Sequence, residues 1–219
     1  FINCYFSILH QAIIYAAKQN NILTIEMQHG VISKNQLPYI LPKDIGKHTY
    51  PNYFLSFGEI EKNIISSNFI NNDKIIPIGN FYLEYIKNNN EIDPHQTLKK
   101  QYKKIVTISS QNIVEKKLLE FIIKAANRVP NICFIFIPRR YSKFQLNNTT
   151  LPDNILINKK YNLYSSAIFS DYHATVFSTF ASESLFLGTP NIMINIDNLS
   201  KIHFLDILPN NQYVNFIDT

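Results

Sequence analysis

Small polar and ionisable side chains follow several short apolar runs of this sequence. In open parallel sheets, ligands bind outside the carboxyl ends of the strands, so the residues just after each strand are the candidates for chemistry. Four such strand ends stand out: Gln28-His29-Gly30, Gly79-Asn80, Ser109-Ser110-Gln111 and Ser178-Thr179.

Ser178 and Thr179 precede a predicted helix whose first turn carries Ser182 and Glu183. Free backbone N–H groups and hydroxyls at a helix start favour a phosphate group. The Glu183 carboxylate could accept two sugar hydroxyls. Ordinary capping is the alternative, because Ser and Thr commonly begin helices and first-turn acids favour the helix dipole.

Two further strand ends carry groups that suit an anionic ligand. The segment Ser109-Ser110-Gln111 precedes Asn112 and Glu115, which have the spacing of a capping box, so plain capping is the alternative to ligand binding. Arg139 and Arg140 follow a strongly apolar run. Their guanidinium groups could bind a diphosphate bidentately, or could belong to a solvated basic loop.

His29 is the candidate general base. An imidazole titrates near physiological pH, so at a strand tip it could take a proton from an acceptor hydroxyl or donate to phosphate. Gly30 would let the backbone approach a ligand closely, and we expect Glu26 to point the same way along the strand. A structural histidine bound to a backbone carbonyl is the alternative. The other histidines have no ligand spacing between them, so we expect no metal site.

Short β-branched runs alternate with helical patterns almost throughout, which predicts an α/β fold with parallel sheets flanked by helices. A helix is expected in residues 1–21. Strands are expected at 22–28, 53–58, 74–79, 104–111, 132–138, 154–159, 173–178 and 191–196, and further helices at 59–69, from residue 112 to about 129, at 161–170 and at 180–188. A polar, Asn-rich and Lys-rich stretch at 84–104 predicts two domains, 1–90 and 104–219, joined by a linker at 91–103.

Composition limits the class of protein. The chain has 219 residues, 46% of them hydrophobic, which is enough for a sizeable core. Its net charge of +5 suits an anionic partner, but no nucleic-acid-binding signature is present. No apolar run reaches the roughly 20 residues that span a bilayer, and two isolated cysteines in apolar segments fit a reducing compartment, so we expect a cytoplasmic protein. Because the chain starts at Phe1 and not at Met, we expect its N-terminal domain to be incomplete.

The order of these segments resembles a family. It is similar to the two-domain, GT-B-fold bacterial glycosyltransferases that build capsule and lipopolysaccharide glycans, and to the related polyol-phosphate polymerases of teichoic acid. The segments are "EMQHGVIS", "NYFLSFGE", "KIIPIGN", "VTISSQ" and "TVFSTFASESLFLGTPNIMIN". The resemblance implies two Rossmann-like domains, with a nucleotide-sugar donor on the second. Ser178 and Thr179 would face the donor phosphate, Glu183 the ribose or sugar, and His29 the interdomain cleft.

The resemblance also implies the reaction and the partners. A sugar would pass from the nucleotide-activated donor to a glycan or lipid-linked acceptor, without a metal or another cofactor, and the basic charge would suit peripheral docking at the cytoplasmic membrane face. Many relatives have a His-Pro pair where this chain has "FIPRRYS". Arg139 or Arg140 could replace that histidine, or the donor differs, or activity is lost. A non-hydrolysing nucleotide-sugar 2-epimerase and a non-catalytic nucleotide-sugar-binding or assembly protein are the alternatives.

Overall fold

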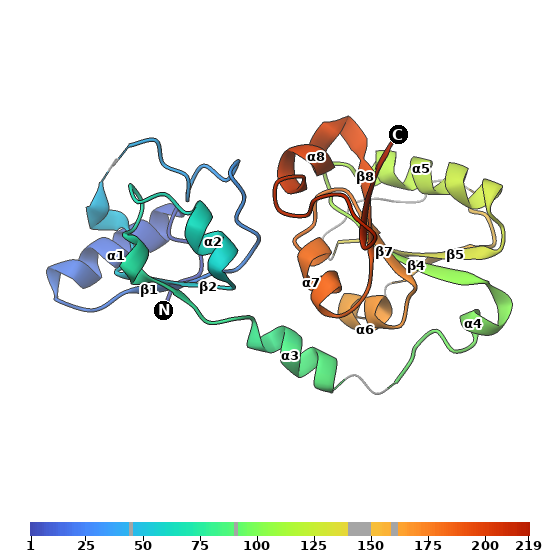
Figure 1. The fold of residues 1–219 in the computed structure, drawn as a ribbon, viewed down its shortest axis with the longest axis horizontal. Coiled ribbons are helices and arrows are strands. Elements are labelled where there is room, and N and C mark those ends of the chain that lie inside the picture. The colour runs from blue at the N-terminus through green and yellow to red at the C-terminus, as the bar shows by residue number, and fades with distance from the viewer. Residues whose placement is uncertain (44–45, 90–91, 140–149, 159–161) are drawn as a thin grey trace. The chain divides into compact units, whose positions relative to one another are not determined.

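A computed structural model describes residues 1–43, 46–89, 92–139, 150–158 and 162–219 (Figure 1). Contacts divide the chain into two compact units, Phe1–Phe81 and Tyr82–Thr219. The segment 91–103, expected as a linker, is therefore grouped with the second unit. None of the described helices is both long enough and apolar enough to cross a membrane.

The first unit is built on a three-stranded parallel sheet in the order β1-β2-β3. Helix α1 begins at Ile8 because the Ser7 hydroxyl accepts a hydrogen bond from the backbone N–H of His10. The elements are α1 (Ile8–Gln19), β1 (Ile25–Met27), the 3₁₀ turn η1 (Lys47–Thr49), β2 (Tyr53–Ser56), α2 (Glu59–Ile64), the 3₁₀ turn η2 (Asn72–Lys74) and β3 (Ile75–Pro77). Each strand lies within a predicted one and is shorter.

Aromatic rings form the core of the first unit. Tyr5 stacks on Phe69 with 4.5 Å between ring centroids, and Tyr39 meets Phe54 edge-to-face at 5.5 Å. Edge-to-face and offset pairs of this kind add to the stabilisation from burial alone. Glu26 is the buried residue of β1, and its carboxylate accepts hydrogen bonds from the Tyr39 hydroxyl and the Tyr5 backbone N–H of this cluster.

The second unit has a six-stranded, all-parallel sheet in the order β6-β5-β4-β7-β8-β9. Numbered along the unit, this is the doubly wound Rossmann order 3-2-1-4-5-6. The strands are β4 (Lys104–Ser109), β5 (Ile132–Ile137), β6 (Ile155–Ile157), β7 (Tyr172–Thr175), β8 (Asn191–Asn195) and β9 (Val214–Asp218). The helices are α3 (Phe81–Asn88), α4 (Leu98–Gln101), α5 (Glu115–Arg128), α6 (Leu163–Ile168), α7 (Phe180–Phe186) and α8 (Leu199–Phe204), the last preceded by the 3₁₀ turn η3 (Ile196–Asn198).

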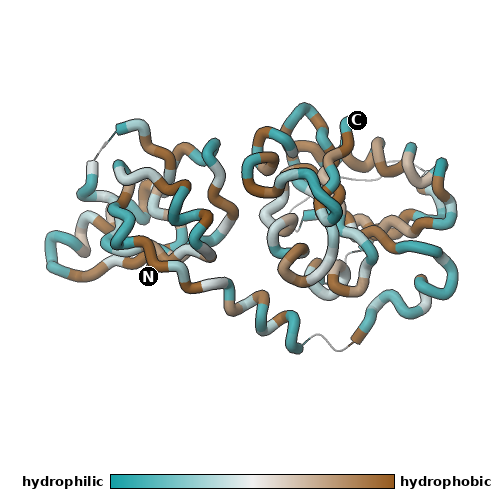
Figure 2. Tube along the Cα trace, viewed as in Figure 1, coloured by the Kyte–Doolittle hydropathy of each residue, from teal (hydrophilic) through white to brown (hydrophobic). Residues whose placement is uncertain are grey.

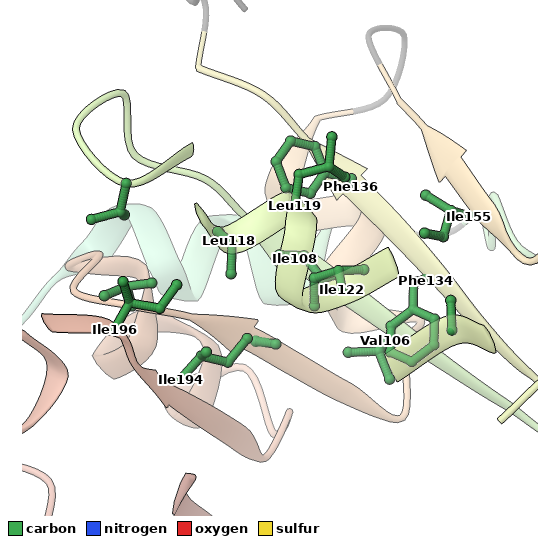
Figure 3. Packing of buried hydrophobic residues seen from close by; sticks show 14 residues of the cluster. Val106, Ile108, Leu118, Leu119, Ile122, Phe134, Phe136, Ile155, Ile194 and Ile196 are labelled. Atoms are coloured by element: carbon green, nitrogen blue, oxygen red, sulfur yellow. The ribbon is translucent and has the colours of Figure 1, made fainter. Parts of the chain in front are cut away.

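The two faces of this sheet differ in chemistry along β4, β7 and β8. Side chains of a strand alternate between faces. One face buries Val106, Ile108 and Ala174 with Leu118 and Ile122 of α5, in the core shown in Figure 3. The opposite face buries polar side chains. Thr107 bonds to Ser166 of α6, and His173 and Asn191 bond to Ser184 of α7, while Ser109 and Thr175 bond within the sheet.

Four elements differ from the sequence predictions. Helices α3 and α4 were not predicted: α3 overlaps the start of the polar stretch at 84–104, and α4 lies within it. Hydrophilic and hydrophobic residues alternate along α3, as Figure 2 shows, and its Leu83 is buried. Helix α8 and strand β9 were not predicted. Strand β9 completes the sheet edge by pairing with β8 from Val214 to Asp218.

The predicted capping box at the start of α5 is wrong. Val114, and not Asn112, occupies the N-cap position, without a side-chain capping bond, and Glu115 is the first residue of the helix. Asn112 is exposed. The Glu115 carboxylate instead accepts a short hydrogen bond from the Ser110 hydroxyl, so it turns toward the strand end and not toward the N–H of Asn112.

Candidate functional site

The point where the strand order reverses lies between β4 and β7. The chain leaves β4 toward β5 on one side and leaves β7 toward β8 on the other, and in such sheets ligands bind at this switch point. The structure therefore brings together two of the predicted strand ends, Ser109-Ser110-Gln111 after β4 and Ser178-Thr179 beyond β7. Arg139, which is exposed, follows β5 on the far side of β4, and Arg140 lies outside the described residues.

A hydrogen-bonded chain joins the ends of β4 and β7. The Thr175 hydroxyl donates to the backbone carbonyl of Ser109 at 3.0 Å, and the Gln111 side-chain amide donates to the Thr175 hydroxyl at 3.3 Å. All three residues are buried, with Gln111 only 6% exposed. The Oε1 atom of Gln111 has no hydrogen-bond partner among the described residues.

Ser109 also belongs to a buried Ser–His–Asn chain. Its hydroxyl lies 2.8 Å from His173 Nε2, and His173 Nδ1 lies 2.6 Å from Asn191 Oδ1. Asn191 Nδ2 donates to the Ala181 carbonyl, so Oδ1 is the end that faces the imidazole. Nδ1 must therefore carry the proton, and Nε2 accepts the Ser109 proton. Burial lowers the pKa of His173 to about 4, so the ring is neutral at physiological pH.

The start of α5 already holds a carboxylate. Glu115 is 4% exposed, and it accepts the Ser110 hydroxyl proton at the positive end of a 14-residue helix. Ser110 is thus bonded to a protein group, in the position where the sequence predicted a ligand contact.

The loop before α7 shows local capping. The Ser178 hydroxyl accepts from the backbone N–H of Phe180 at 3.3 Å, as in the capping alternative. Thr179 occupies the N-cap position without a side-chain capping bond and is partly exposed. The Ser182 hydroxyl, in the first turn, is buried and has no partner among the described residues.

Glu183 is half-buried and is held in place by a tyrosine. Its Oε2 accepts the Tyr164 hydroxyl proton at 2.8 Å. Burial raises the pKa of Glu183, and the bond from Tyr164 opposes that rise. One of the two carboxylate oxygens is thereby bonded to the protein.

His29 lies at the tip of the loop that follows β1 in the first unit. It is exposed, and its ring lies 6.4 Å from that of Phe6. Its ring makes no hydrogen bond to any residue that the structure describes. Partial desolvation lowers the pKa of its imidazole, which favours the neutral form that a base requires.

Gln28 fixes the backbone on both sides of His29. Its Oε1 accepts the backbone N–H of Phe57 at 2.7 Å, and its Nε2 donates to the Gly30 carbonyl at 2.8 Å and to Glu61 at 3.3 Å. The amide of Gln28 therefore ties the loop to the end of β2.

Glu26 does not point the same way as His29, contrary to expectation. It is fully buried, and its Oε1 accepts bonds from the Tyr39 hydroxyl at 2.8 Å and the Tyr5 backbone at 3.2 Å. Burial raises the pKa of Glu26 to about 7. Glu26 and His29 are three residues apart, so the alternation of a strand itself places them on opposite faces, and β1 moreover ends at Met27.

The last predicted strand end, Gly79-Asn80, follows β3. Gly79 has φ of 78°, a left-handed conformation that favours glycine, and α3 begins two residues later. Asn80 is partly exposed. Across the described ranges, no group of three or more His, Cys, Asp or Glu residues is arranged to hold a metal ion.

No protein-family model and no curated protein sequence matches this chain. Solved structures do match its fold. The UDP-GlcNAc 2-epimerase from Neisseria meningitidis, bound to UDP-GlcNAc, gives a TM-score of 0.62 at 19% identity, covering 88% of this chain and 58% of that one. The fold is GT-B-like. The predicted class, α/β with two Rossmann-like parallel sheets, is thereby confirmed.

Two further matches are a polymerase and a glycotransferase by name. The wall teichoic acid polymerase TagF gives a TM-score of 0.51 at 15% identity, over 81% of this chain and 50% of that one. The glycotransferase of kitacinnamycin gives 0.62 at 12% identity, over 95% and 60%. This chain thus spans between half and two thirds of the length of the structures it matches.

Sequence reasoning missed three residues of this site. Gln111 was noted only as part of a strand end, Thr175 only as part of a strand, and His173 only as a histidine without ligand spacing. Their link through Ser109 depends on β4 lying next to β7, which no local pattern encodes. The one available signal was Gln111, a long polar side chain directly after a strand with five consecutive buried residues.

Proposed function

We propose that this chain is part of a glycosyltransferase that moves a sugar from a nucleotide-activated donor to a bacterial surface glycan of the capsule or lipopolysaccharide type. The observation that carries the proposal is the hydrogen-bonded link between Gln111 and Thr175 at the β4–β7 switch point of a doubly wound sheet, where such folds bind ligands. Matches to a 2-epimerase bound to UDP-GlcNAc, to a wall teichoic acid polymerase and to a glycotransferase support it.

The residues take distinct roles in the proposed reaction. Glu183 Oε1 accepts hydroxyls of the donor, and the hydroxyls of Thr179 and Ser182, with Arg139, supply donors and positive charge for its phosphates. An acceptor hydroxyl forms a bond to the anomeric carbon while the bond from that carbon to the phosphate oxygen breaks. His29 takes the proton of the acceptor hydroxyl, and the nucleotide leaves with the bonding electron pair. No cofactor enters this scheme, and no metal is needed.

Partners and location follow from the same proposal. The acceptor is a growing glycan or a lipid-linked precursor. The net charge of +5 would favour peripheral binding at the anionic, cytoplasmic face of the membrane.

A nucleotide-sugar 2-epimerase is the second candidate, and the Neisseria meningitidis match favours it. Such an enzyme must remove and return a proton at the sugar carbon, so it needs acid and base groups next to C2. Among the described residues after the strands of the second unit, Glu115 is bonded to Ser110 and Glu183 to Tyr164. This arrangement is better suited to binding than to proton transfer at carbon.

The test uses the full-length protein that contains this chain, with nucleotide-sugar donors and a glycan acceptor. We expect release of the nucleotide only when the acceptor is present, and a loss of roughly 10²- to 10⁴-fold in rate for His29→Ala, the usual contribution of a general base. His48→Ala, an exposed histidine of the same unit, is the matched control. Equal rates for His29→Ala and wild type would exclude His29 as the base, and inversion of the sugar at C2 without acceptor would establish the epimerase.

A further inference from the structure

The side-chain amide of Gln111 is bonded at one end only. Its Nε2 donates to the Thr175 hydroxyl at 3.3 Å, while its Oε1 is buried and accepts no hydrogen bond from any residue that the structure describes. The side chain is 94% buried, and buried polar groups in folded proteins are nearly always bonded. The free oxygen therefore requires an explanation.

The orientation of this amide is fixed by the proton of Thr175. A hydroxyl has one proton, and that of Thr175 goes to the backbone carbonyl of Ser109 at 3.0 Å. Thr175 can then only accept from Gln111. The NH₂ end of the amide must face Thr175, since a rotated amide would set two oxygens against each other. The Oε1 atom is consequently a pure acceptor, directed away from Thr175.

The charge around this strand end also selects the ligand group. The segment from Ser109 to Glu115 contains no Lys or Arg, and it includes the buried carboxylate of Glu115. A diphosphate oxygen has no proton to donate to Oε1, and the Glu115 carboxylate already occupies the positive end of α5. A sugar or ribose hydroxyl, or an N–H of a base or an acetamido group, would complete the bond.

We propose that Gln111 Oε1 accepts a hydrogen bond from a hydroxyl or N–H group of the bound nucleotide sugar, so that the end of β4 reads a neutral part of the donor and not its phosphates. This inference rests on the proposed function, which it deepens by assigning a specificity-determining residue. Under this proposal, a hydrogen-donating group of the ligand lies at the end of β4, and the phosphates bind elsewhere at the site.

The test compares Gln111→Met with wild type by isothermal titration, using UDP-GlcNAc and inorganic diphosphate as probes. Methionine keeps the size of the side chain and removes both polar ends. We expect Gln111→Met to weaken UDP-GlcNAc binding roughly three- to tenfold, the net worth of one hydrogen bond, with no change for diphosphate. Gln101→Met, on the exposed helix α4, is the matched control. Equal UDP-GlcNAc affinity, or equal losses for both probes, would overturn the inference.

Two further measurements keep the outcomes apart. The melting temperature of ligand-free Gln111→Met should equal or exceed that of wild type, because the variant removes an unpaired buried oxygen; a fall of several degrees would instead make Gln111 a structural residue.

The second measurement uses UDP-GlcNAc analogues that each lack one hydrogen-donating group. For the analogue that lacks the group bonded to Gln111, the variant and wild type should bind with equal affinity. If wild type binds no nucleotide sugar at all, the proposed function fails and this inference fails with it, whereas binding that is insensitive to Gln111 overturns the inference alone.

Discussion

The hydroxyl of Ser109 on β4 lies 2.8 Å from Nε2 of His173 on β7, and it donates its proton to a ring that is already committed to Asn191 through Nδ1. This bond ties together the two strands that flank the switch point. Because both residues are buried, neither partner can be replaced by water without a rearrangement.

Ser109→Ala should therefore be costly for stability. The substitution leaves a buried imidazole nitrogen without its donor, and we expect the free energy of unfolding to fall by about 1–3 kcal/mol. Ser67→Ala, at an exposed position, should leave it unchanged. Urea unfolding followed by circular dichroism measures both, and a Ser109→Ala variant as stable as wild type would mean that the Ser109–His173 bond contributes nothing net.

His173 should make the second unit sensitive to acid. Its pKa falls from an ordinary value of 6.5 to about 4 on folding, so between these values the unfolded chain binds the additional proton and stability declines as the pH falls. At about 1.4 kcal/mol for each pKa unit, the full effect is about 3 kcal/mol. His173→Gln should remove this contribution, seen as a shallower loss of unfolding free energy between pH 6.5 and pH 4. His203→Gln is the control, and an unaltered slope in His173→Gln would contradict the assignment.

Glu26 should act in the opposite direction in the first unit. Its pKa rises from an ordinary value of 4.5 to about 7 on folding, so the folded chain holds the proton between these values and stability declines as the pH rises. The expected loss from pH 4.5 to pH 7 is about 3 kcal/mol. Glu26→Gln keeps an acceptor for Tyr39 and cannot ionise, so it should flatten this decline. A Glu26→Gln variant with the pH dependence of wild type would show that the carboxyl ionises in the folded state without penalty.

Tyr164→Phe tests the positioning of Glu183. The Tyr164 hydroxyl bond lowers the pKa of Glu183, so its removal should move upward the pH below which the carboxylate becomes protonated. Titration with UDP-GlcNAc between pH 5 and pH 8 should show affinity lost at a higher pH than in wild type, by roughly three- to tenfold where the two curves differ most. Tyr85→Phe, an exposed tyrosine of α3, should match wild type. Coincident curves for Tyr164→Phe and wild type would exclude Glu183 from donor binding.

Much of the fold could be predicted from the sequence because short apolar runs mark its strands. Ile132–Ile137 is buried on both faces and is nearly all apolar, and Tyr53–Ser56 is recognisable from its apolar and aromatic residues. The start of α5 could not be predicted, because Asn112 and Glu115 have the sequence spacing of a capping box. Only the structure shows that Glu115 bonds to the Ser110 hydroxyl instead. Helix α3 was hidden by its Asn-rich and Lys-rich surroundings.

The candidate site was only partly predictable for a related reason. Residues directly after strands could be named, and the structure brings those after β4 and β7 to adjacent strands. The hydrogen bonds that each side chain can make there depend on which acceptors the neighbouring hydroxyl groups already use. The Thr175 hydroxyl donates its proton to the Ser109 carbonyl, so the amide of Gln111 turns its NH₂ end to Thr175 and its Oε1 stays unpaired. This arrangement depends on β4 and β7 being neighbours in the sheet.

The polar face of the second sheet has a consequence for how its helices assemble. Apolar side chains can shift slightly against one another at little cost, but hydrogen bonds depend on direction as well as distance. Here Thr107 bonds to Ser166 of α6, and His173 bonds to Ser184 of α7. A shift of either helix by one residue would leave several buried hydroxyl groups without hydrogen-bond partners. This face therefore favours one position of α6 and α7 against the sheet, and it thereby fixes where the loop between β7 and α7 joins α7.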